Sequence, residues 1–293
     1  MQGKNVRWGD IMVCMVPTLN NRLDEYKRKL SQYNSVLFDE CHLASSKTSK
    51  RVISNLFNTV VRVGLSGTPL LHKDPTKNMD IMAFFGDVVY KITNRELMDM
   101  GYSTPVKVKM LLGNLDIKYK GDYDREYEEG IISNKDREKR ILDRVSFYLH
   151  RAQYPILIIG KYHRHVEGFY KKCKREFGSS YRIAYIHGKV KDRYEILDRY
   201  KEGDIDILIA SYLIKLGQNM PKIRVIINMA GGDSHINAIQ IIGRLIRKHD
   251  SKKKVIYDDF YDEGAYLKRH SKHRIMYYKK EKYPVLELYK RGK

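Results

Sequence analysis

The sequence predicts an α/β protein with two parallel-sheet domains, the first of which is incomplete on its N-terminal side. Short apolar runs alternate with segments whose apolar residues recur at helical spacing, which is typical of βα units and a parallel sheet. Five such runs lie between residues 154 and 258, whereas only three comparable runs precede residue 70. The difference suggests that the first domain lacks part of its sheet.

In the first domain, residues 11–16, 35–38 and 60–66 are apolar and are expected to be strands. Residues 19–30 and 47–57 carry apolar side chains at helical spacing and are expected to be helices between the strands. This order of strand and helix predicts βα units.

The second domain is expected to contain a complete doubly wound sheet. Its five candidate strands are residues 154–160, 181–186, 205–210, 225–229 and 255–258. Before them come a partly alternating run at 106–112, a charged and Tyr-rich stretch at 122–140 and a helical segment at 142–149. We therefore expect a first domain over 1–100, a connector over 101–145, a second domain over 146–265 and a basic tail over 266–293.

The charge of the chain favours a nucleic-acid partner. Lys and Arg total 56 against 35 Asp and Glu, which gives a formal net charge of +21. Such an excess attracts a polyanion through counterion release and predicts strongly salt-dependent binding. A ribosomal-type partner or a Lys-rich coding bias would also explain the excess.

The three cysteines are far apart in sequence, so we expect neither a disulfide framework nor a Cys-rich zinc site. There is no run long enough to span a membrane and no pattern of a secretory signal peptide. An intracellular protein is expected.

Two adjacent carboxylates follow the strand at 35–38, in the segment Asp39-Glu40-Cys41-His42. Open α/β sheets bind ligands beyond the carboxyl ends of their strands. Nucleotide hydrolases need one acid to hold Mg²⁺ beside the phosphates and another to polarise the attacking water. By itself, an acidic pair at a turn could equally cap a helix.

Two further motifs follow in order along the chain. Ser66-Gly67-Thr68-Pro69 comes directly after an apolar strand, where two hydroxyls flank a glycine, although an ordinary Gly-Pro turn would look similar. In Gln240-Ile241-Ile242-Gly243-Arg244-Leu245-Ile246-Arg247, a helix would place Arg244 and Arg247 on one face. Guanidinium groups suit phosphate because they remain charged and bind it bidentately. The alternative is a basic helix face against solvent or nucleic acid.

This ordered set resembles the superfamily-two helicases of the DExH type, and the connector pattern resembles the phage UvsW-like DNA helicases. The resemblance implies two RecA-like domains of the P-loop NTPase fold, with ATP and Mg²⁺ as ligands. It implies that Asp39 holds Mg²⁺, that Glu40 is the general base, and that Arg244 and Arg247 stabilise the transferring phosphoryl group. It also implies coupling roles for a further set of residues, which are His42, Ser66, Thr68, Gly217 and Gln240.

The same resemblance implies nucleic-acid contacts by His187, after a strand, and by Ser211, in the family's fifth motif. At Asn219 the family usually has an acidic residue, so a direct role for Asn219 is not expected. Lys268 and Arg269 begin a tail in which basic residues alternate with tyrosines. That tail could bind a nucleic-acid backbone and stack bases, or it could be a terminal helix whose tyrosines pack on the second domain.

One expected element is missing from the sequence. No segment has the Gly-x-x-x-x-Gly-Lys-Ser/Thr spacing of a phosphate loop. The resemblance therefore implies an ATP-dependent DNA helicase of the replication, repair and branch-migration type that is split or truncated, in the host cytoplasm if phage-encoded. The phosphate loop would come from a separate polypeptide or from a longer form of the chain. The alternative is a catalytically inactive helicase remnant or subunit that binds nucleic acid.

Overall fold

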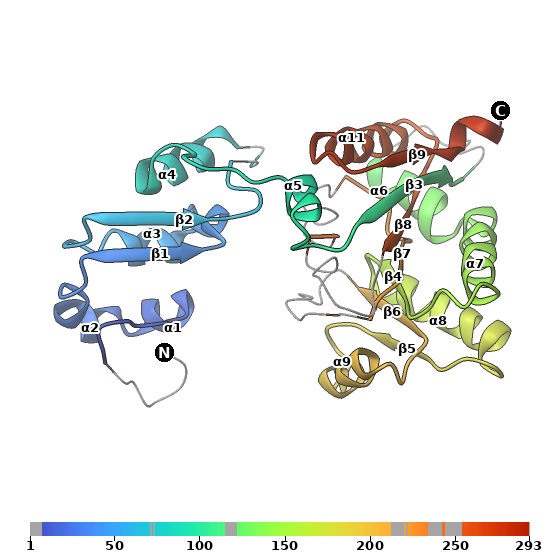
Figure 1. The fold of residues 1–293 in the computed structure, drawn as a ribbon, viewed down its shortest axis with the longest axis horizontal. Helices are drawn as coiled ribbons and strands as arrows, with labels where there is room; N and C mark the ends of the chain where they lie inside the picture. Colours follow the sequence, from blue (N-terminus) through green and yellow to red (C-terminus); the bar gives the residue numbers. More distant parts are fainter. Residues whose placement is uncertain are drawn as a thin grey trace. The chain divides into compact units, whose positions relative to one another are not determined.

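The chain forms two compact units, residues 1–91 and 92–293, which are described here separately (Figure 1). The structure is a computed structural model. It describes residues 8–70, 72, 74–114, 122–211, 220, 222–233, 242–243 and 254–292.

The first unit is built on two parallel strands. In chain order its elements are α1 (Val16–Asn21), α2 (Leu23–Leu30), β1 (Ser35–Asp39), η1 (Cys41–Leu43), α3 (Lys47–Ile53), β2 (Val61–Leu65) and α4 (Pro75–Phe85). The two strands confirm the predicted runs at 35–38 and 60–66. The strand predicted at 11–16 is wrong, because α1 begins at Val16 with a proline in its first turn. Proline suits the first turn of a helix, because the backbone N–H that it lacks would have no partner within the helix there. In a strand, the same N–H would be needed for the hydrogen bonds of the sheet.

One face of the β1–β2 sheet packs on helices, and the other is open within the described residues. Val36 and Phe38 contribute to the two apolar clusters formed with α1, α2, α3 and α4. The opposite face is apolar but exposed, with exposed fractions of 66% for Leu37, 53% for Val61, 40% for Val63 and 45% for Leu65. Parallel sheets are normally covered on both faces, so this open face is unusual.

The second unit contains a larger sheet with helices between its strands. Its elements are α5 (Asn94–Asp99), β3 (Val106–Leu112), α6 (Tyr123–Tyr127), η2 (Glu128–Ile132), α7 (Lys135–Leu149), β4 (Ile156–Gly160), α8 (His163–Phe177), β5 (Ile183–Ile186), α9 (Arg193–Glu202), β6 (Ile207–Ser211), β7 (Val225–Asn228), β8 (Val255–Tyr261), α11 (Tyr266–Lys280), β9 (Val285–Glu287) and η3 (Leu288–Gly292). All five predicted strands of this domain are confirmed as β4 to β8.

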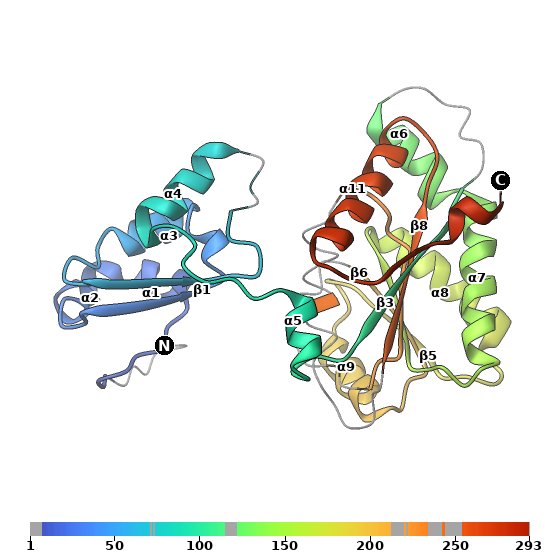
Figure 2. The ribbon, with the colours of Figure 1, turned by 45° about the horizontal axis from the view of Figure 1, so that its top comes forward.

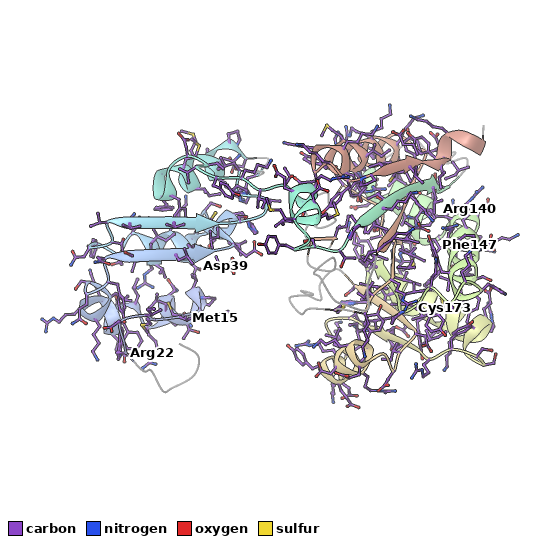
Figure 3. All side chains as sticks on the ribbon, viewed as in Figure 1. Met15, Arg22, Asp39, Arg140, Phe147 and Cys173 are labelled. Atoms are coloured by element: carbon purple, nitrogen blue, oxygen red, sulfur yellow. The ribbon has the colours of Figure 1, made fainter. Side chains whose placement is uncertain are left out.

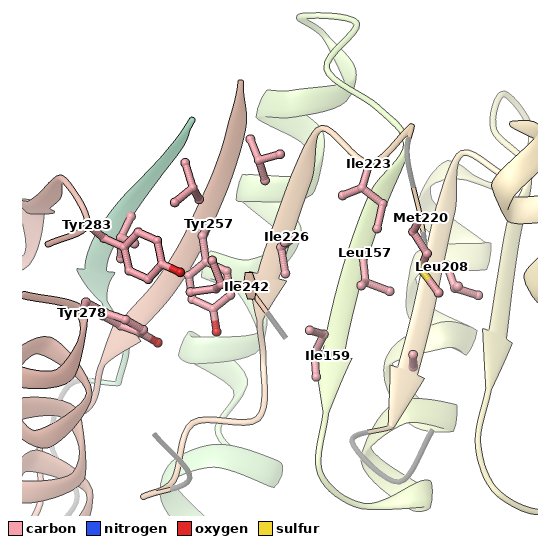
Figure 4. Close-up of a cluster of buried hydrophobic side chains, with 14 of the residues drawn as sticks. Leu157, Ile159, Leu208, Met220, Ile223, Ile226, Ile242, Tyr257, Tyr278 and Tyr283 are labelled. Carbon is pink, nitrogen blue, oxygen red and sulfur yellow. The ribbon is translucent and has the colours of Figure 1, made fainter. Parts of the chain in front are cut away.

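The sheet has seven strands in the order β5-β6-β4-β7-β8-β3-β9, and each neighbouring pair is parallel. Helices α7 and α8 cover one face, and α9 and α11 cover the other (Figure 2). Residues of β4 alternate between the two cores: Leu157 and Ile159 face the α11 side (Figure 4), whereas Ile156 and Ile158 face α7 and α8. Burial on both faces explains why these strands appear in the sequence as continuous apolar runs.

The expected connector over 101–145 is instead part of the second unit. Strand β3 pairs with both β8 and β9, and α7 contributes Ile141, Val145 and Tyr148 to the core. The division between the units falls after Lys91 rather than at residue 100. The expected tail is also integrated, because Tyr278 and Tyr283 lie in the core of the sheet. This favours the alternative in which the tail tyrosines pack on the second domain.

Candidate nucleotide-hydrolysis and nucleic-acid sites

Asp39 is the last residue of β1 (Figure 3), and Glu40 follows it in a turn. Glu40 has a left-handed backbone, with φ 52° and ψ 50°, and Asp39 Oδ1 accepts a hydrogen bond from the Glu40 N–H at 2.9 Å. For a residue with a side chain, this conformation costs about 1–2 kcal/mol. Strain of this kind is concentrated at functional sites, where the surrounding structure maintains it.

The Asp-Glu motif and the Ser-Gly-Thr-Pro motif are joined through His42. His42 Nδ1 lies 3.3 Å from Glu40 Oε2 and 3.0 Å from Ser66 Oγ. Ser66 Oγ in turn accepts a hydrogen bond from the Thr68 N–H at 3.0 Å. The parallel register, which pairs Asp39 with Leu65, brings the two motifs to the same edge of the sheet. The structure thus places four predicted coupling and catalytic residues in one connected cluster with Asp39.

The backbone beneath this cluster is closely packed. Cys41 is buried, and burial raises the pKa of its thiol, so it is an apolar packing group and not a nucleophile. A Cβ at Gly64 would lie 3.0 Å from both Cys41 and Phe85, which explains a glycine there. His72 Nε2 lies 2.7 Å from the carbonyl oxygen of His42 and holds η1 from the other side.

The two carboxylates fit a magnesium site of the nucleotide type. Among the described residues, no group of three or more His, Cys, Asp or Glu side chains could hold a metal ion. Mg²⁺ is usually bound through one or two carboxylates together with waters and substrate phosphates, rather than in an all-protein cage. Asp39, an exposed acid at a strand end, therefore suits a magnesium ion that arrives with a nucleotide.

In the second unit, Ser211 and His187 lie at the carboxyl edge of the seven-stranded sheet. Ser211 ends β6 and pairs with Gly160 of β4, while His187 follows the neighbouring strand β5. The Ser211 Oγ is buried and has no hydrogen-bond partner among the described residues. Buried hydroxyls normally have a hydrogen-bond partner in the protein, a water or a ligand.

His187 belongs to a short column of rings. Its ring centroid lies 4.4 Å from that of His163 and 5.8 Å from that of Tyr185. Burial lowers the pKa of His187, and the neighbouring His163 lowers it further. Because Nδ1 accepts a hydrogen bond from the Lys189 N–H at 3.2 Å, the neutral ring carries its proton on Nε2. That N–H can donate to a phosphate oxygen.

Lys161 was not among the predicted site residues, yet it has a distinctive environment. It directly follows β4, and its ammonium lies 5.4, 4.6 and 4.7 Å from the ring centroids of Tyr123, Tyr127 and Tyr162. Burial works to lower the pKa of Lys161, but Tyr162 and Tyr123 raise it overall, so the cation is retained. Sequence reasoning missed this cage because two of its rings come from α6, far away along the chain.

The two predicted tail contacts differ. Lys268 Nζ forms an ion pair with Glu263 Oε2 at 2.9 Å, whereas the exposed Arg269 guanidinium lies 5.3 Å from the ring centroid of Tyr266. Further along α11, Arg274 is fully buried and pairs with Asp259 at 2.8 Å. Arg274 therefore cannot bind a nucleic-acid backbone from the surface.

Gly217, Gln240, Arg244 and Arg247 lie outside the described residues. The structure does describe Ile242 and Gly243 in the middle of the Gln240–Arg247 motif. Ile242 is fully buried in the core of the second unit (Figure 4).

Two family models each match a part of the chain. Residues 4–140 match the SWI2/SNF2 ATPase family, and residues 137–249 match the helicase conserved C-terminal domain. The chain is 26% identical to the ATP-dependent DNA helicase uvsW of Enterobacteria phage T4, over 92% of this chain and 57% of that protein. It is 25% identical to the putative helicase 22 of a Sulfolobus islandicus filamentous virus, over 85% of this chain and 46% of that protein.

The crystal structure of T4 UvsW has a similar fold, with a TM-score of 0.52 and 21% identity, over 93% of this chain and 56% of that one. The chain thus spans about half the length of the curated relatives it matches. Within the described residues, no helix has the length and apolar composition that a membrane span requires.

Proposed function

We propose that this chain, which belongs to the superfamily-two helicases through its SWI2/SNF2 ATPase and helicase C-terminal domains, acts in ATP-dependent DNA unwinding and branch migration. The observation that carries the proposal is the cluster in which His42 contacts both Glu40 and Ser66. A turn that only caps a helix would not need a histidine between its acid and the next motif. A hydrolase does need one, because its catalytic acid must be held in one orientation and must be linked to the motif that follows.

In the proposed reaction, Asp39 would hold the magnesium ion that accompanies ATP, and Glu40 would accept the proton of the attacking water. The ion, when bound, neutralises charge on the phosphates. The contact with His42 keeps the Glu40 carboxylate in position, and the Ser66 hydroxyl extends that link toward Thr68. Arg244 and Arg247 would stabilise the negative charge of the transferring phosphoryl group.

The carboxyl edge of the second unit is the proposed contact for DNA. Lys161 and His187 follow β4 and β5, and Ser211 is the last residue of β6 between them. They supply a cation, an N–H donor and a hydroxyl. Such groups bind phosphate oxygens and position a strand without reading its sequence. DNA is favoured over RNA because the phage relative is a DNA helicase by name.

We further propose that a segment with a phosphate loop, from a separate polypeptide or a longer form of this chain, completes the site. The open face of β1 and β2 supports this. Leu37, Val63 and Leu65 remain exposed on a parallel sheet that would normally be covered. A covering segment would bury these side chains and could bring backbone N–H groups and a lysine to the phosphates.

The test is strand displacement from a DNA fork, a three-strand junction and an RNA duplex, by wild type and by Glu40→Gln. The chain is assayed with the translated product of the reading frame upstream of its Met1 codon. We expect ATP-dependent displacement of the DNA strands by wild type. Glu40→Gln should lower the rate by at least about 100-fold, because it removes a general base.

The rival function is a nucleic-acid-binding remnant, which the net charge of +21 would also serve. A remnant should bind the fork equally well as wild type and as Glu40→Gln, and neither protein should displace a strand. That result would overturn the helicase proposal, and preferential displacement from the RNA duplex would overturn the choice of DNA.

A further inference from the structure

The loop between β2 and α4 contacts His42 at two different points. Near the start of this loop, Ser66 Oγ lies 3.0 Å from His42 Nδ1. Further along it, His72 Nε2 lies 2.7 Å from the His42 carbonyl oxygen. Because a carbonyl oxygen only accepts, His72 Nε2 carries a proton and donates this hydrogen bond. One loop therefore contacts both the ring and the backbone of His42.

His72 is itself held by a residue of α4. The Asn78 side-chain amide accepts a hydrogen bond from the His72 N–H at 3.2 Å and donates one to the His72 carbonyl oxygen at 3.0 Å. One amide group thus binds both backbone groups of one residue. A surface loop does not require such a pair, since water can satisfy its backbone groups. The position of His72 therefore depends on Asn78.

The turn that His72 contacts contains a strained residue. Glu40 has a left-handed backbone, which residues with a Cβ rarely adopt. Such a conformation persists where neighbouring contacts maintain it. The Glu40 carbonyl oxygen accepts a hydrogen bond from the Leu43 N–H at 2.9 Å, which closes the turn around His42. The bond from His72 to the His42 carbonyl oxygen therefore acts on the same turn that holds Glu40.

These contacts form a continuous path from α4 to the proposed general base. Asn78 binds His72, His72 binds the His42 backbone, and the His42 ring lies 3.3 Å from Glu40 Oε2. Helix α4 also packs against the turn, because Ile81 of α4 and Cys41 of η1 belong to one buried apolar cluster. The orientation of the turn and the position of α4 are thus linked by both polar and apolar contacts.

The start of α4 does not require this path. Asp74 Oδ1 accepts a hydrogen bond from the Thr76 N–H at 3.0 Å, and Pro75 lies in the first turn of the helix. A capping aspartate and a proline are the usual signals that begin a helix. The bonds from Asn78 to His72 and from His72 to His42 are additional to these signals.

We propose that His72 and Asn78 are positioning residues for Glu40. They hold the turn and its histidine so that the Glu40 carboxylate stays directed at one point, where it can accept a proton with little reorganisation. A displacement of α4 would change that orientation. This inference rests on the proposed function, in which Glu40 is the general base.

The first experiment is hydrogen–deuterium exchange of the full chain, followed by mass spectrometry on a peptide that covers residues 38–46. Asparagine at position 72 is too short to bring a donor to the His42 carbonyl oxygen, whereas glutamine places its amide nitrogen near the position of imidazole Nε2. We expect His72→Asn to accelerate exchange in this peptide about fivefold, the factor for one lost hydrogen bond. His72→Gln should stay within twofold of wild type.

A matched pair of asparagine variants tests the contact of α4 with His72. Asn78→Ala removes both bonds to the His72 backbone and should accelerate exchange of residues 38–46 at least twofold. Asn58 is the control, because its side chain also donates to a backbone carbonyl oxygen of the first unit, that of Ser31 at 2.7 Å, and contacts no residue of η1 in this bond. Asn58→Ala should leave exchange of residues 38–46 unchanged.

The second experiment asks whether His72 acts through Glu40. Strand displacement is measured for His72→Asn, for Glu40→Gln and for the double variant, under the conditions of the helicase test. His72→Asn should slow displacement about tenfold by misplacing the base. In the Glu40→Gln background, the same substitution should slow it less than twofold, because the base is already absent. A merely structural role would slow both backgrounds by the same factor.

The proposal is overturned if His72→Asn leaves exchange of residues 38–46 unchanged, if His72→Gln behaves like His72→Asn, or if both backgrounds are slowed equally. Exchange requires no ATP. If wild type displaces no strand, the helicase proposal fails, and the exchange experiment still decides whether His72 and Asn78 hold the turn.

Discussion

The parallel sheets of the two units differ in how their faces are covered. In the second unit, seven strands are covered on both faces by α7, α8, α9 and α11. In the first unit, two strands are covered on one face only, and the described residues leave Leu37 and Val63 exposed on the other. A two-stranded sheet of this kind has little stability by itself.

The comparison shows that the contacts of the proposed hydrolytic motif form on a sheet of which the structure describes two strands. The contacts among Glu40, His42 and Ser66 depend only on β1, β2 and the turns that follow them. The second unit, by contrast, keeps its groups in place with long-range buried pairs such as Arg137 with Asp262. We infer that the first unit supplies the residues that contact the metal ion and the attacking water of a nucleotide site. Further residues would be needed to bind the phosphates.

The largest expected effect is on the second unit alone. Asp259→Ala leaves Arg274 as a buried charge without its partner and should cost about 3–5 kcal/mol of unfolding free energy. Far-UV circular dichroism during urea unfolding measures this loss. Trp8, the single tryptophan of the chain, lies in the first unit, 5.2 Å from the ring centroid of Tyr26, and its fluorescence reports that unit. A shift of the fluorescence transition as large as the dichroism shift would contradict independent units.

A pair of equivalent truncations compares the two sheets directly. Ile158→Ala creates a cavity in the fully covered sheet and should cost about 2–5 kcal/mol. Leu37→Ala removes an aliphatic side chain from the open face and should change stability by less than about 0.5 kcal/mol. Urea unfolding followed by both probes measures the two effects. Equal costs would show that the open face is covered in solution.

A smaller effect is expected from pH. Burial lowers the pKa of His165 in the second unit to about 3, below its ordinary value, with help from Arg137. The unfolded chain therefore binds this proton first, and stability falls as the pH drops below about 6.5 toward 3. Between pH 6 and pH 5 the loss should be about 1 kcal/mol, near the slope for one proton. His165→Leu should flatten this slope in the dichroism transition, and an unchanged slope would contradict the assignment.

The smallest effect is expected from Lys161, which we propose contacts a phosphate group of the nucleic acid. Lys161→Ala should weaken binding of a single-stranded oligonucleotide modestly and reduce the salt dependence of the binding constant by about one unit. Lys29 of the first unit is a matched control, because its ammonium also lies over an aromatic ring, 4.9 Å from the Trp8 centroid. Fluorescence anisotropy at several salt concentrations measures both variants. An equal loss of affinity for Lys29→Ala would show that both units contact the oligonucleotide to the same extent.

Local patterns were sufficient to predict the central strands and to mark Asp39–His42 as a candidate site after a strand. Strands β4 to β8 are buried on both faces and are therefore apolar throughout, and Glu40 and His42 contact each other within one turn. The strand predicted at 11–16 was wrong, because residues 11–15 form neither helix nor strand and Val16 begins a helix with Pro17 in its first turn. Strand β9 was missed because it is a short edge strand of three residues.

The remaining features depend on contacts that are distant in sequence. Arg137 and Asp262 are 125 residues apart, and a fully buried arginine is rare, so neither spacing nor composition predicts the pair. The tyrosine rings around Lys161 were missed for the same reason. Tyr123 and Tyr127 come from a distant segment that was recognised in the sequence only as charged and Tyr-rich.

The most direct test of the central claim is ATP hydrolysis by the purified chain with Mg²⁺, with and without single-stranded DNA, beside Glu40→Gln. The account predicts that wild type binds DNA but hydrolyses ATP no faster than Glu40→Gln, because in our proposal the phosphate loop comes from a separate polypeptide or a longer form of the chain. Robust DNA-stimulated hydrolysis by wild type that Glu40→Gln abolishes would show that the chain contains a complete nucleotide site, and would contradict the account.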